Sequence, residues 1–130
     1  MSDHLRLRCW GSDWDLPSVD IDSLSVICYS KFTNAPLEIA ECLPKKAITG
    51  TLPELEVQEN VYSQLLRIIS IFRREGYNAD FNLSGDENAD TLAFLAYIQQ
   101  KLKPALLYTL WLDAANFTKV VRPAYASLCG

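Results

Sequence analysis

Apolar and polar residues alternate near the start of the chain. Leu5, Leu7 and Cys9 alternate with Arg6 and Arg8, which predicts a strand with one buried face. Similar short patterns predict three further strands, at residues 37–42, 55–57 and 61–62. A tight turn is expected between the last two strands, at residues 58–60.

Helical periodicity follows the first strand. A helix is expected to begin at Pro17 and Ser18, with acidic residues in its first turn that complement the helix dipole. Apolar residues then recur at spacings of three and four, which predicts a single buried face made of Ile21, Leu24, Cys28 and Phe32.

A second helical pattern begins after the last predicted strand. Leu65, Ile68, Ile69 and Phe72 follow the i, i+3, i+4, i+7 spacing, and Gly76 is placed to end the helix. This pattern predicts an amphipathic helix with one face in the core.

The last third of the chain is predicted to be entirely helical. The sequence 84–87 fits a capping box, and residues 92–102 are apolar around most of a helix circumference. Pro104 is expected to kink or break this helix, and another helix is expected from Ala114. Because such an apolar helix needs neighbours on several sides, a large apolar patch is expected to remain exposed.

The order strand, helix, strand, strand, strand, helix, then helices only, is that of a thioredoxin-like α/β domain followed by a truncated all-helical region. We place the first domain at residues 1–80 and the incomplete helical region, of the glutathione S-transferase type, at 81–130. The first two strands should be parallel and the last two antiparallel. Thioredoxin-like folds keep a cis proline before the third strand, so Pro53 is expected to follow a cis bond.

Composition narrows the class of protein. Hydrophobic residues make up 49% of the 130 residues, enough for a core, and the net charge of −4 argues against nucleic-acid binding. The longest apolar stretch, at 104–112, is about half of the roughly 20 residues that span a bilayer. Any membrane association is therefore expected through partners or through a C-terminal segment absent from this sequence.

The cysteines form no metal-binding or disulfide pattern. Cys9, Cys28, Cys42 and Cys129 include no Cys-x-x-Cys pair, and the single histidine is His4. We therefore expect no metal site and no cofactor. The thiols are expected to be reduced and mostly buried, in a chain that faces the cytosol.

An ordered series of motifs resembles the metaxin family. The series spans residues 5–125 and comprises Cys9-Trp10-Gly11 through Trp14, Leu16-Pro17-Ser18-Val19, Asp22-Ser23-Leu24, Gly50-Thr51-Leu52-Pro53, Tyr77-Asn78-Ala79-Asp80, Ala89-Asp90-Thr91-Leu92-Ala93-Phe94, Lys101-Leu102 with Pro104, and Trp111. Any one block is weak, whereas their order and spacing are specific to the family.

The resemblance implies a function in mitochondrial protein import. Metaxins have a glutathione S-transferase architecture, lie on the cytosolic face of the mitochondrial outer membrane, and pair with other metaxins. Within the sorting and assembly machinery they support import and the insertion of barrel proteins. The resemblance thus implies a non-catalytic subunit acting through protein contacts. Family members usually continue through a full helical domain, and several end in a membrane anchor, so this sequence is read as either a fragment or a short isoform.

The main alternative is a glutathione-binding or glutathione transferase enzyme. Such enzymes activate the glutathione thiol with a hydroxyl or thiol after the first strand, where this chain has Cys9 and Ser12. They hold the glutamyl end of glutathione with an acidic residue and a serine, positions that fall here on Gln64 and Leu65, or on Ser63 if the register shifts. Leu65 offers no hydrogen bond, and Cys9 has no accompanying histidine, so we assign no catalytic residue.

Two tryptophans are candidates for contacts with a partner protein. Trp10 and Trp14 flank the loop after the first strand, and tryptophan is enriched at binding hot spots. Packing over the core is the equally weighted alternative for both, whereas core packing is favoured for Trp111. A third functional hypothesis is a soluble regulator that competes with full-length relatives for their partners.

Overall fold

The computed structural model describes residues 4–129. The chain forms two compact units, Met1–Ala79 and Asp80–Gly130. Each unit is described separately below.

The first unit is built on a four-stranded mixed sheet. Its strands are β1 (Leu5–Cys9), β2 (Leu37–Glu41), β3 (Glu54–Val57) and β4 (Asn60–Ser63), in the spatial order β2-β1-β3-β4. β1 pairs with β2 in parallel, whereas β3 is antiparallel to both β1 and β4. The Leu52–Pro53 bond is cis. The thioredoxin-like fold predicted from the sequence is thus confirmed, together with its strand directions and cis proline.

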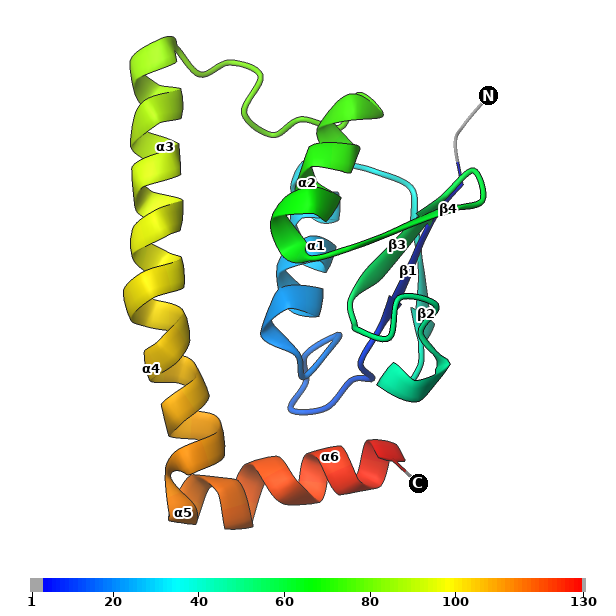
Figure 1. Cartoon of the computed structure of the whole chain (residues 1–130), viewed down its shortest axis with the longest axis vertical. Coiled ribbons are helices and arrows are strands. Elements are labelled where there is room, and N and C mark those ends of the chain that lie inside the picture. Colours follow the sequence, from blue (N-terminus) through cyan, green and yellow to red (C-terminus); the bar gives the residue numbers. More distant parts are fainter. Residues whose placement is uncertain (1–3, 130) are drawn as a thin grey trace. The chain divides into compact units, whose positions relative to one another are not determined.

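Two helices, α1 (Ile21–Phe32) and α2 (Leu65–Arg74), cover the same face of this sheet (Figure 1). The alternating residues of β1 and β3 meet the helices there, and the side chains of Leu7, Leu55 and Phe72 are fully buried. Tyr29 of α1 contacts Phe72 edge-on, with ring centroids 5.8 Å apart. The connection from β2 to β3 contains only a short 3₁₀ helix, η1 (Pro44–Lys46).

The buried face of α1 is not the predicted one. Ser23, Val26, Ile27 and Ser30 are buried, whereas Cys28 is exposed and Phe32 has an exposed fraction of 82%. The serines tolerate burial because their polar groups are satisfied. The Ser23 hydroxyl donates to the Asp20 carboxylate at 2.7 Å, and the Ser30 hydroxyl donates to the Ile27 carbonyl at 2.6 Å.

This helix also begins later than predicted. Asp20 is its N-cap, and the Asp20 carboxylate accepts a hydrogen bond from the Ser23 amide at 3.0 Å. Pro17 and Ser18 therefore belong to the preceding loop. In contrast, the predicted α2 is confirmed. Of its predicted face, Ile68 and Phe72 are buried and Leu65 and Ile69 are half-buried, while Ile71, which was not predicted there, is also buried.

The second unit is helical throughout. Its segments are α3 (Gly85–Tyr97), η2 (Ile98–Leu102), α4 (Lys103–Leu107), η3 (Tyr108–Leu112), α5 (Ala114–Asn116), η4 (Phe117–Val121) and α6 (Arg122–Cys129), of which η2, η3 and η4 are π-helical. The capping box predicted at Ser84 and Glu87 is present.

Pro104 was predicted to kink or break this helix, and the break is wrong. The chain stays helical from α3 through α4, and it turns at Asp113, whose ψ of 114° leaves the helical range. Pro104 lies in the first turn of α4, directly after π-helical η2, where the ring is accommodated by the changed hydrogen-bond register. The Asp113 carboxylate then caps the next helix by accepting from the Asn116 amide at 3.1 Å.

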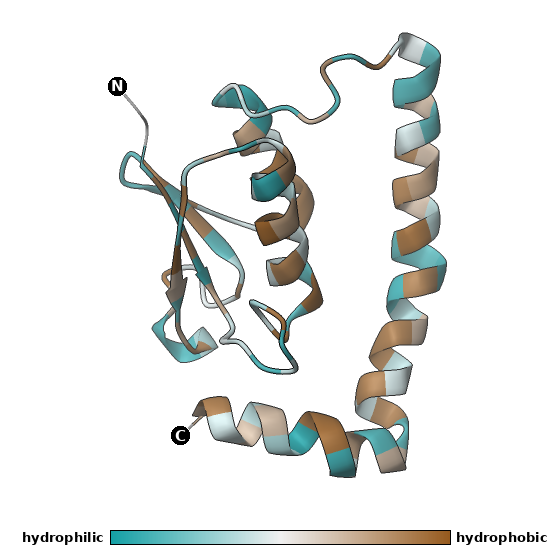
Figure 2. Ribbon diagram, turned by 180° about the vertical axis from the view of Figure 1, so that it is seen from behind, coloured by the Kyte–Doolittle hydropathy of each residue, from teal (hydrophilic) through white to brown (hydrophobic). Residues whose placement is uncertain are grey.

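After the polar first turns of α3, apolar residues recur along these helices (Figure 2). Many of them are exposed, among them Leu92, Phe94, Tyr97 and Leu112, as the sequence predicted. Trp111, which was expected in the core, is 40% exposed and contacts the rings of Phe117 and Tyr125. Among the described residues, no helix is both long and apolar enough to cross a membrane.

Candidate functional site

Cys9 is the last residue of β1. The loop that follows contains the candidate residues Trp10, Ser12 and Trp14, and hydrogen bonds hold its two ends together. The Val19 amide donates to the Gly11 carbonyl at 3.0 Å. The buried Ser18 hydroxyl donates to the Trp10 carbonyl at 2.8 Å and accepts from the Asp20 amide at 3.2 Å. The backbone at Trp10 is therefore fixed against the start of α1.

Trp14 lies in a tight turn at the far end of this loop. The Leu16 amide donates to the Asp13 carbonyl at 2.9 Å, and the Trp14 amide donates to the Asp13 carboxylate at 2.7 Å. Trp14 and Asp15 both adopt left-handed backbone conformations, with φ values of 54° and 58°. Such conformations are costly for non-glycine residues, and Trp10 and Trp14 are both half-buried. The turn therefore holds a large aromatic side chain at a defined and partly accessible position.

Cys9 is unsuited to act as a nucleophile. Its side chain is fully buried on the helix-facing side of β1. Burial, together with the nearby Glu41, Cys42 and Asp20, raises the pKa of the thiol to about 12. With this pKa, Cys9 stays protonated at neutral pH. Because the thiolate is the reactive form of a cysteine, the thiol of Cys9 is a poor nucleophile. The structure thus makes it a core residue.

Ser12 is exposed. It lies between Gly11, whose carbonyl accepts from the Val19 amide, and the turn at Asp13–Leu16. Its neighbour in sequence, Asp13, uses its carboxylate to accept from the Trp14 amide. A serine in such a loop is typical of turn chemistry. It is the one hydroxyl in this loop accessible to a ligand, because Ser18 is buried.

The start of α2 contains the other candidate positions. Leu65 is half-buried and packs against the core, so it cannot take the place of a ligand-binding serine. Ser63 lies in β4, where it pairs with Glu54 of β3. Gln64, between them, has a φ of 73° and a ψ of 131°, a conformation that L-residues rarely adopt. Such strain is often found at binding sites.

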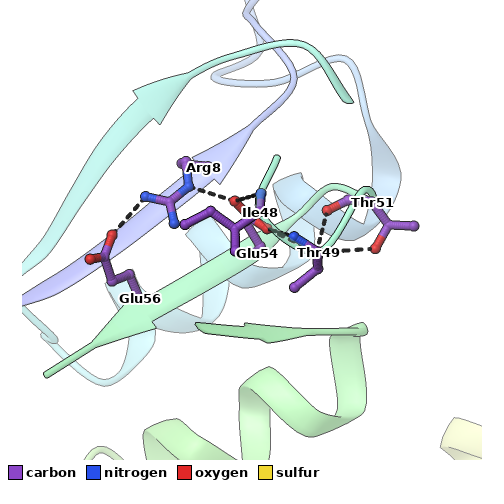
Figure 3. A network of polar contacts seen from close by, with 6 residues as sticks. All are labelled: Arg8, Ile48, Thr49, Thr51, Glu54 and Glu56. Carbon is purple, nitrogen blue, oxygen red and sulfur yellow. Dashed lines mark hydrogen bonds and ion pairs between the residues drawn. The ribbon is translucent and has the colours of Figure 1, made fainter. Parts of the chain in front are cut away.

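An unpredicted polar network lies on the opposite face of the sheet from the helices (Figure 3). The Glu54 side chain is fully buried and accepts four hydrogen bonds. Its Oε1 accepts from Arg8 Nε at 2.5 Å and from the Ile48 amide at 2.9 Å. Its Oε2 accepts from the Thr49 amide at 2.9 Å and from the Thr49 hydroxyl at 2.8 Å. Arg8 Nη1 also donates to Glu56 at 2.6 Å.

These contacts decide the charge state of Glu54. Burial alone would raise the pKa of its carboxyl, but the hydrogen bonds from Arg8, Thr49 and Ile48 outweigh burial and lower the pKa to about 2. The same pairing raises the pKa of Arg8. Both groups are therefore charged at neutral pH. The network fixes the connection before β3 to the first strand.

The sequence did contain a signal for this network. Arg6 and Arg8 alternate in β1, and Glu54 and Glu56 alternate in β3. Antiparallel pairing brings Arg8 opposite Glu54 and Arg6 opposite Glu56. The pairs could be found only once the register of the two strands was known.

The four thiols are free, but they are not mostly buried as predicted. Cys9 is buried and Cys42 is half-buried, whereas Cys28 and Cys129 are exposed. Between residues 4 and 129 no three His, Cys, Asp or Glu side chains converge in a way that could hold a metal ion.

Solved structures with a similar fold include glutathione transferases. A Nu-class glutathione S-transferase from Haemonchus contortus superimposes with a TM-score of 0.62 at 18% identity, over 97% of this chain and 64% of that one. A glutathione transferase homologue from Sulfitobacter, solved with bound glutathione, superimposes with a TM-score of 0.57 at 12% identity, over 99% and 66% of the chains. At these identities the similarity shows the fold.

The sequence is much closer to mitochondrial proteins. Residues 23–130 match the Tom37 family, described as outer mitochondrial membrane transport complex protein. Metaxin-1 of Sus scrofa is 45% identical over 128 residues, which are 97% of this chain and 40% of that protein. Metaxin-3 of Danio rerio is 39% identical over 128 residues, which are 98% and 41%. The chain thus spans about two fifths of the length of these relatives.

Proposed function

The chain belongs to the metaxin family of outer mitochondrial membrane transport complex proteins, and from this premise we propose that it is a non-catalytic subunit of the mitochondrial sorting and assembly machinery. In this role it supports protein import and the insertion of barrel proteins through contacts with other metaxins and with further subunits. It acts on the cytosolic face of the outer membrane. The family membership itself was predicted from the ordered motifs and is confirmed by the sequence matches.

The state of Cys9 is the observation that carries the non-catalytic part of this proposal. A transferase-like site needs an accessible group after the first strand that can stabilise or form a thiolate. Of the two candidate groups there, the Cys9 thiol is fully buried and its pKa is raised to about 12, whereas Ser12 is exposed beside Asp13, whose carboxylate accepts from the Trp14 amide. Leu65 occupies the position where a hydroxyl would bind the glutamyl end of glutathione, and it packs against the core. A ligand whose polar groups lose such partners binds much more weakly.

We assign the partner contact to Trp10 and Trp14. Hydrogen bonds fix the backbone of both residues, which lowers the entropy lost when a partner orders the loop. Both side chains are half-buried, so part of each ring is accessible. Large aromatic side chains in fixed positions are typical of the residues that dominate binding energy at protein interfaces.

Glutathione binding is the second candidate function. The strained backbone of Gln64 at the start of α2 favours it, because such strain persists where the surroundings enforce it and is common at ligand sites. Exposed Ser12 would be the polar group nearest in sequence to the first strand. A third candidate function is that of a soluble competitor of full-length relatives. Such a competitor would bind the same partners through the same surface as the proposed subunit, but it would displace the full-length relatives from them.

Calorimetric titrations of the purified chain separate these candidates. We expect heat from a purified partner metaxin and none from glutathione at millimolar concentration. The partner heat should be lost in Trp14→Ala and kept in Ser12→Ala. Saturable glutathione binding that disappears in Ser12→Ala would replace the proposed function by the second candidate.

A displacement experiment addresses the third candidate. The chain is added to an isolated complex of a partner with a full-length metaxin. A subunit role predicts that the chain joins the complex without releasing the full-length protein. Release in proportion to added chain would identify a competitor.

A further inference from the structure

One face of the long helix in the second unit combines exposed aromatic rings with two opposite charges. Asp90, Phe94 and Tyr97 of α3 and Lys101 of η2 follow one another at spacings of four, three and four residues. At 3.6 residues per turn, these spacings place the four side chains within about 60° of the helix circumference. We call these four residues the aromatic face. All four are exposed, and the exposed fractions of Phe94 and Tyr97 are 68% and 65%.

The aromatic face continues across the junction between α3 and η2. The φ and ψ angles are −62° and −46° at Tyr97 before η2, and −60° and −46° at Lys103 after it. These are α-helical values, so the single π-helical segment shifts Lys101 around the axis by only a fraction of a turn. The rise of about 1.5 Å per residue sets Asp90 and Lys101 about 17 Å apart along the axis, with both rings between them.

The charges at the two ends of this face indicate its occupant. Asp90 and Lys101 have opposite signs and lie equally far from the midpoint of the face, and Phe94 and Tyr97 also lie equally far from it. A second copy of the helix, antiparallel and related by a two-fold axis through this midpoint, sets each Asp90 opposite a Lys101. The same axis sets each Phe94 opposite a Tyr97. A face that complements itself in this way fits a second copy of the chain.

We propose that the chain forms a symmetric dimer through the aromatic faces of two antiparallel helices. Packed helices have axes about 8–10 Å apart, a separation at which the four rings meet at the centre and the two ion pairs lie at the rim. Burial of the rings supplies most of the affinity, and the ion pairs select the antiparallel direction and the register. Four partly exposed rings cover less than the roughly 1,200 Å² of a stable interface, so we expect a dissociation constant of roughly 10 µM or weaker.

Sedimentation velocity of the full chain between about 1 and 500 µM tests the proposal. We expect the parent chain to change from monomer to dimer across this range. The double variant Phe94→Ala with Tyr97→Ala should associate at least about tenfold more weakly, and its helix should persist because alanine favours helices. Phe81→Ala removes a ring with an exposed fraction of 74% from the same unit. This control should dimerise like the parent, and circular dichroism verifies that each variant folds.

Charge reversal tests the antiparallel register. Asp90→Lys and Lys101→Asp each place like charges opposite one another in their own dimers, so each variant alone should associate at least about tenfold more weakly than the parent. An equimolar mixture of the two variants should associate as the parent does, because each chain offers the charge that the other lacks. Lys119→Asp, at an exposed lysine of η4, changes the same charge in the same unit. This control should stay within about twofold of the parent.

Three results would overturn the proposal. The first is a parent chain that remains monomeric at about 500 µM or forms only larger oligomers. The second is a dimer that survives the loss of both rings of the aromatic face. The third is a mixture of the two charge variants that associates no better than either variant alone.

Partner binding measured on the same variants keeps this proposal separate from the proposed function. Trp10 and Trp14 lie in the first unit, so the Phe94→Ala and Tyr97→Ala variant should still bind a partner metaxin. A parent chain that dimerises but binds no partner metaxin contradicts the proposed function and supports the dimer. If the double variant loses partner binding while the parent remains monomeric, the aromatic face is an interface with a different protein and the dimer proposal is wrong.

Discussion

Replacing Glu54 by glutamine changes one buried charge while keeping the size of the side chain. The carboxylate accepts two hydrogen bonds on each oxygen, from Arg8 and the Ile48 amide on one side and from the Thr49 amide and hydroxyl on the other. In Glu54→Gln one oxygen becomes an amide that can only donate. Turned toward Thr49, this amide can donate to the hydroxyl, but it faces the Thr49 amide donor.

The expected cost follows from these lost contacts. An unsatisfied buried amide costs about 1–3 kcal/mol. Removing one partner of a buried ion pair typically costs about 3–5 kcal/mol in total. Arg8 keeps its bond to Glu56 at 2.6 Å, so we expect about 3 kcal/mol for Glu54→Gln. For Glu56→Gln, which removes a single bond at a partly exposed carboxylate, we expect about 1 kcal/mol.

The contribution of Glu54 to stability should decrease as the pH is lowered. The pKa of Glu54 is lowered from 4.5 in its ordinary state to about 2 in the folded state. Its charged form therefore contributes stability above about pH 4.5, and that contribution is lost as the pH falls to about 2. The difference between the parent chain and Glu54→Gln should shrink over this pH range.

Urea unfolding measures both effects. In a Trp111→Phe background the tryptophan fluorescence comes from Trp10 and Trp14 of the first unit, so it reports on that unit. The midpoints of the parent, Glu54→Gln and Glu56→Gln are compared at neutral pH and at steps toward pH 2. A Glu54→Gln penalty below that of Glu56→Gln, or one that stays constant down to pH 2, would refute the reasoning.

Three further predictions concern the first unit. Ile27→Ala should lower its unfolding free energy by about 2–4 kcal/mol and Phe32→Ala by less than about 0.5 kcal/mol, because only Ile27 is buried. Urea unfolding measures both values, and equal effects would contradict the assignment of Ile27 to the buried face of α1. Alkylation at mildly alkaline pH, followed by mass spectrometry, should label Cys28 rapidly and Cys9 only after unfolding. The reason is that Cys9 is buried and its pKa is about 12. Comparable labelling rates would show that Cys9 is accessible. Glu59→Gly should stabilise the unit by up to about 1 kcal/mol, because Glu59 has a φ of 70° in the turn before β4, and a lower thermal midpoint would contradict this assignment.

The first unit could be predicted well where a single residue pattern determined the outcome. The strands of the sheet and the buried face of α2 followed from local periodicity. The prediction for α1 failed because that helix buries Ser23 and Ser30, whose hydroxyls are satisfied by Asp20 and Ile27. A pattern that treats every polar residue as exposed therefore selected the wrong face, which includes Phe32.

The candidate site was harder to predict because its chemistry depends on tertiary contacts. The Arg8–Glu54 pair required the strand register, and the hydrogen bonds of Glu54 required the path of residues 48 and 49. Likewise, the position of Cys9 in the core followed from strand alternation, but its raised pKa depends on what surrounds it. The helical path through Pro104 depended on a π-helical turn that has no recognised sequence signal.

Affinity isolation from intact mitochondria tests the central claim most directly. A tagged form of the chain is crosslinked and isolated from mitochondria beside two variants, Cys9→Ala with Ser12→Ala and Trp10→Ala with Trp14→Ala. The account predicts that other metaxins and assembly-machinery subunits are enriched with the parent and with the first variant, and lost with the second. Absence of these subunits from the parent isolate, or their loss in the Cys9 and Ser12 variant alone, would contradict a non-catalytic role through protein contacts.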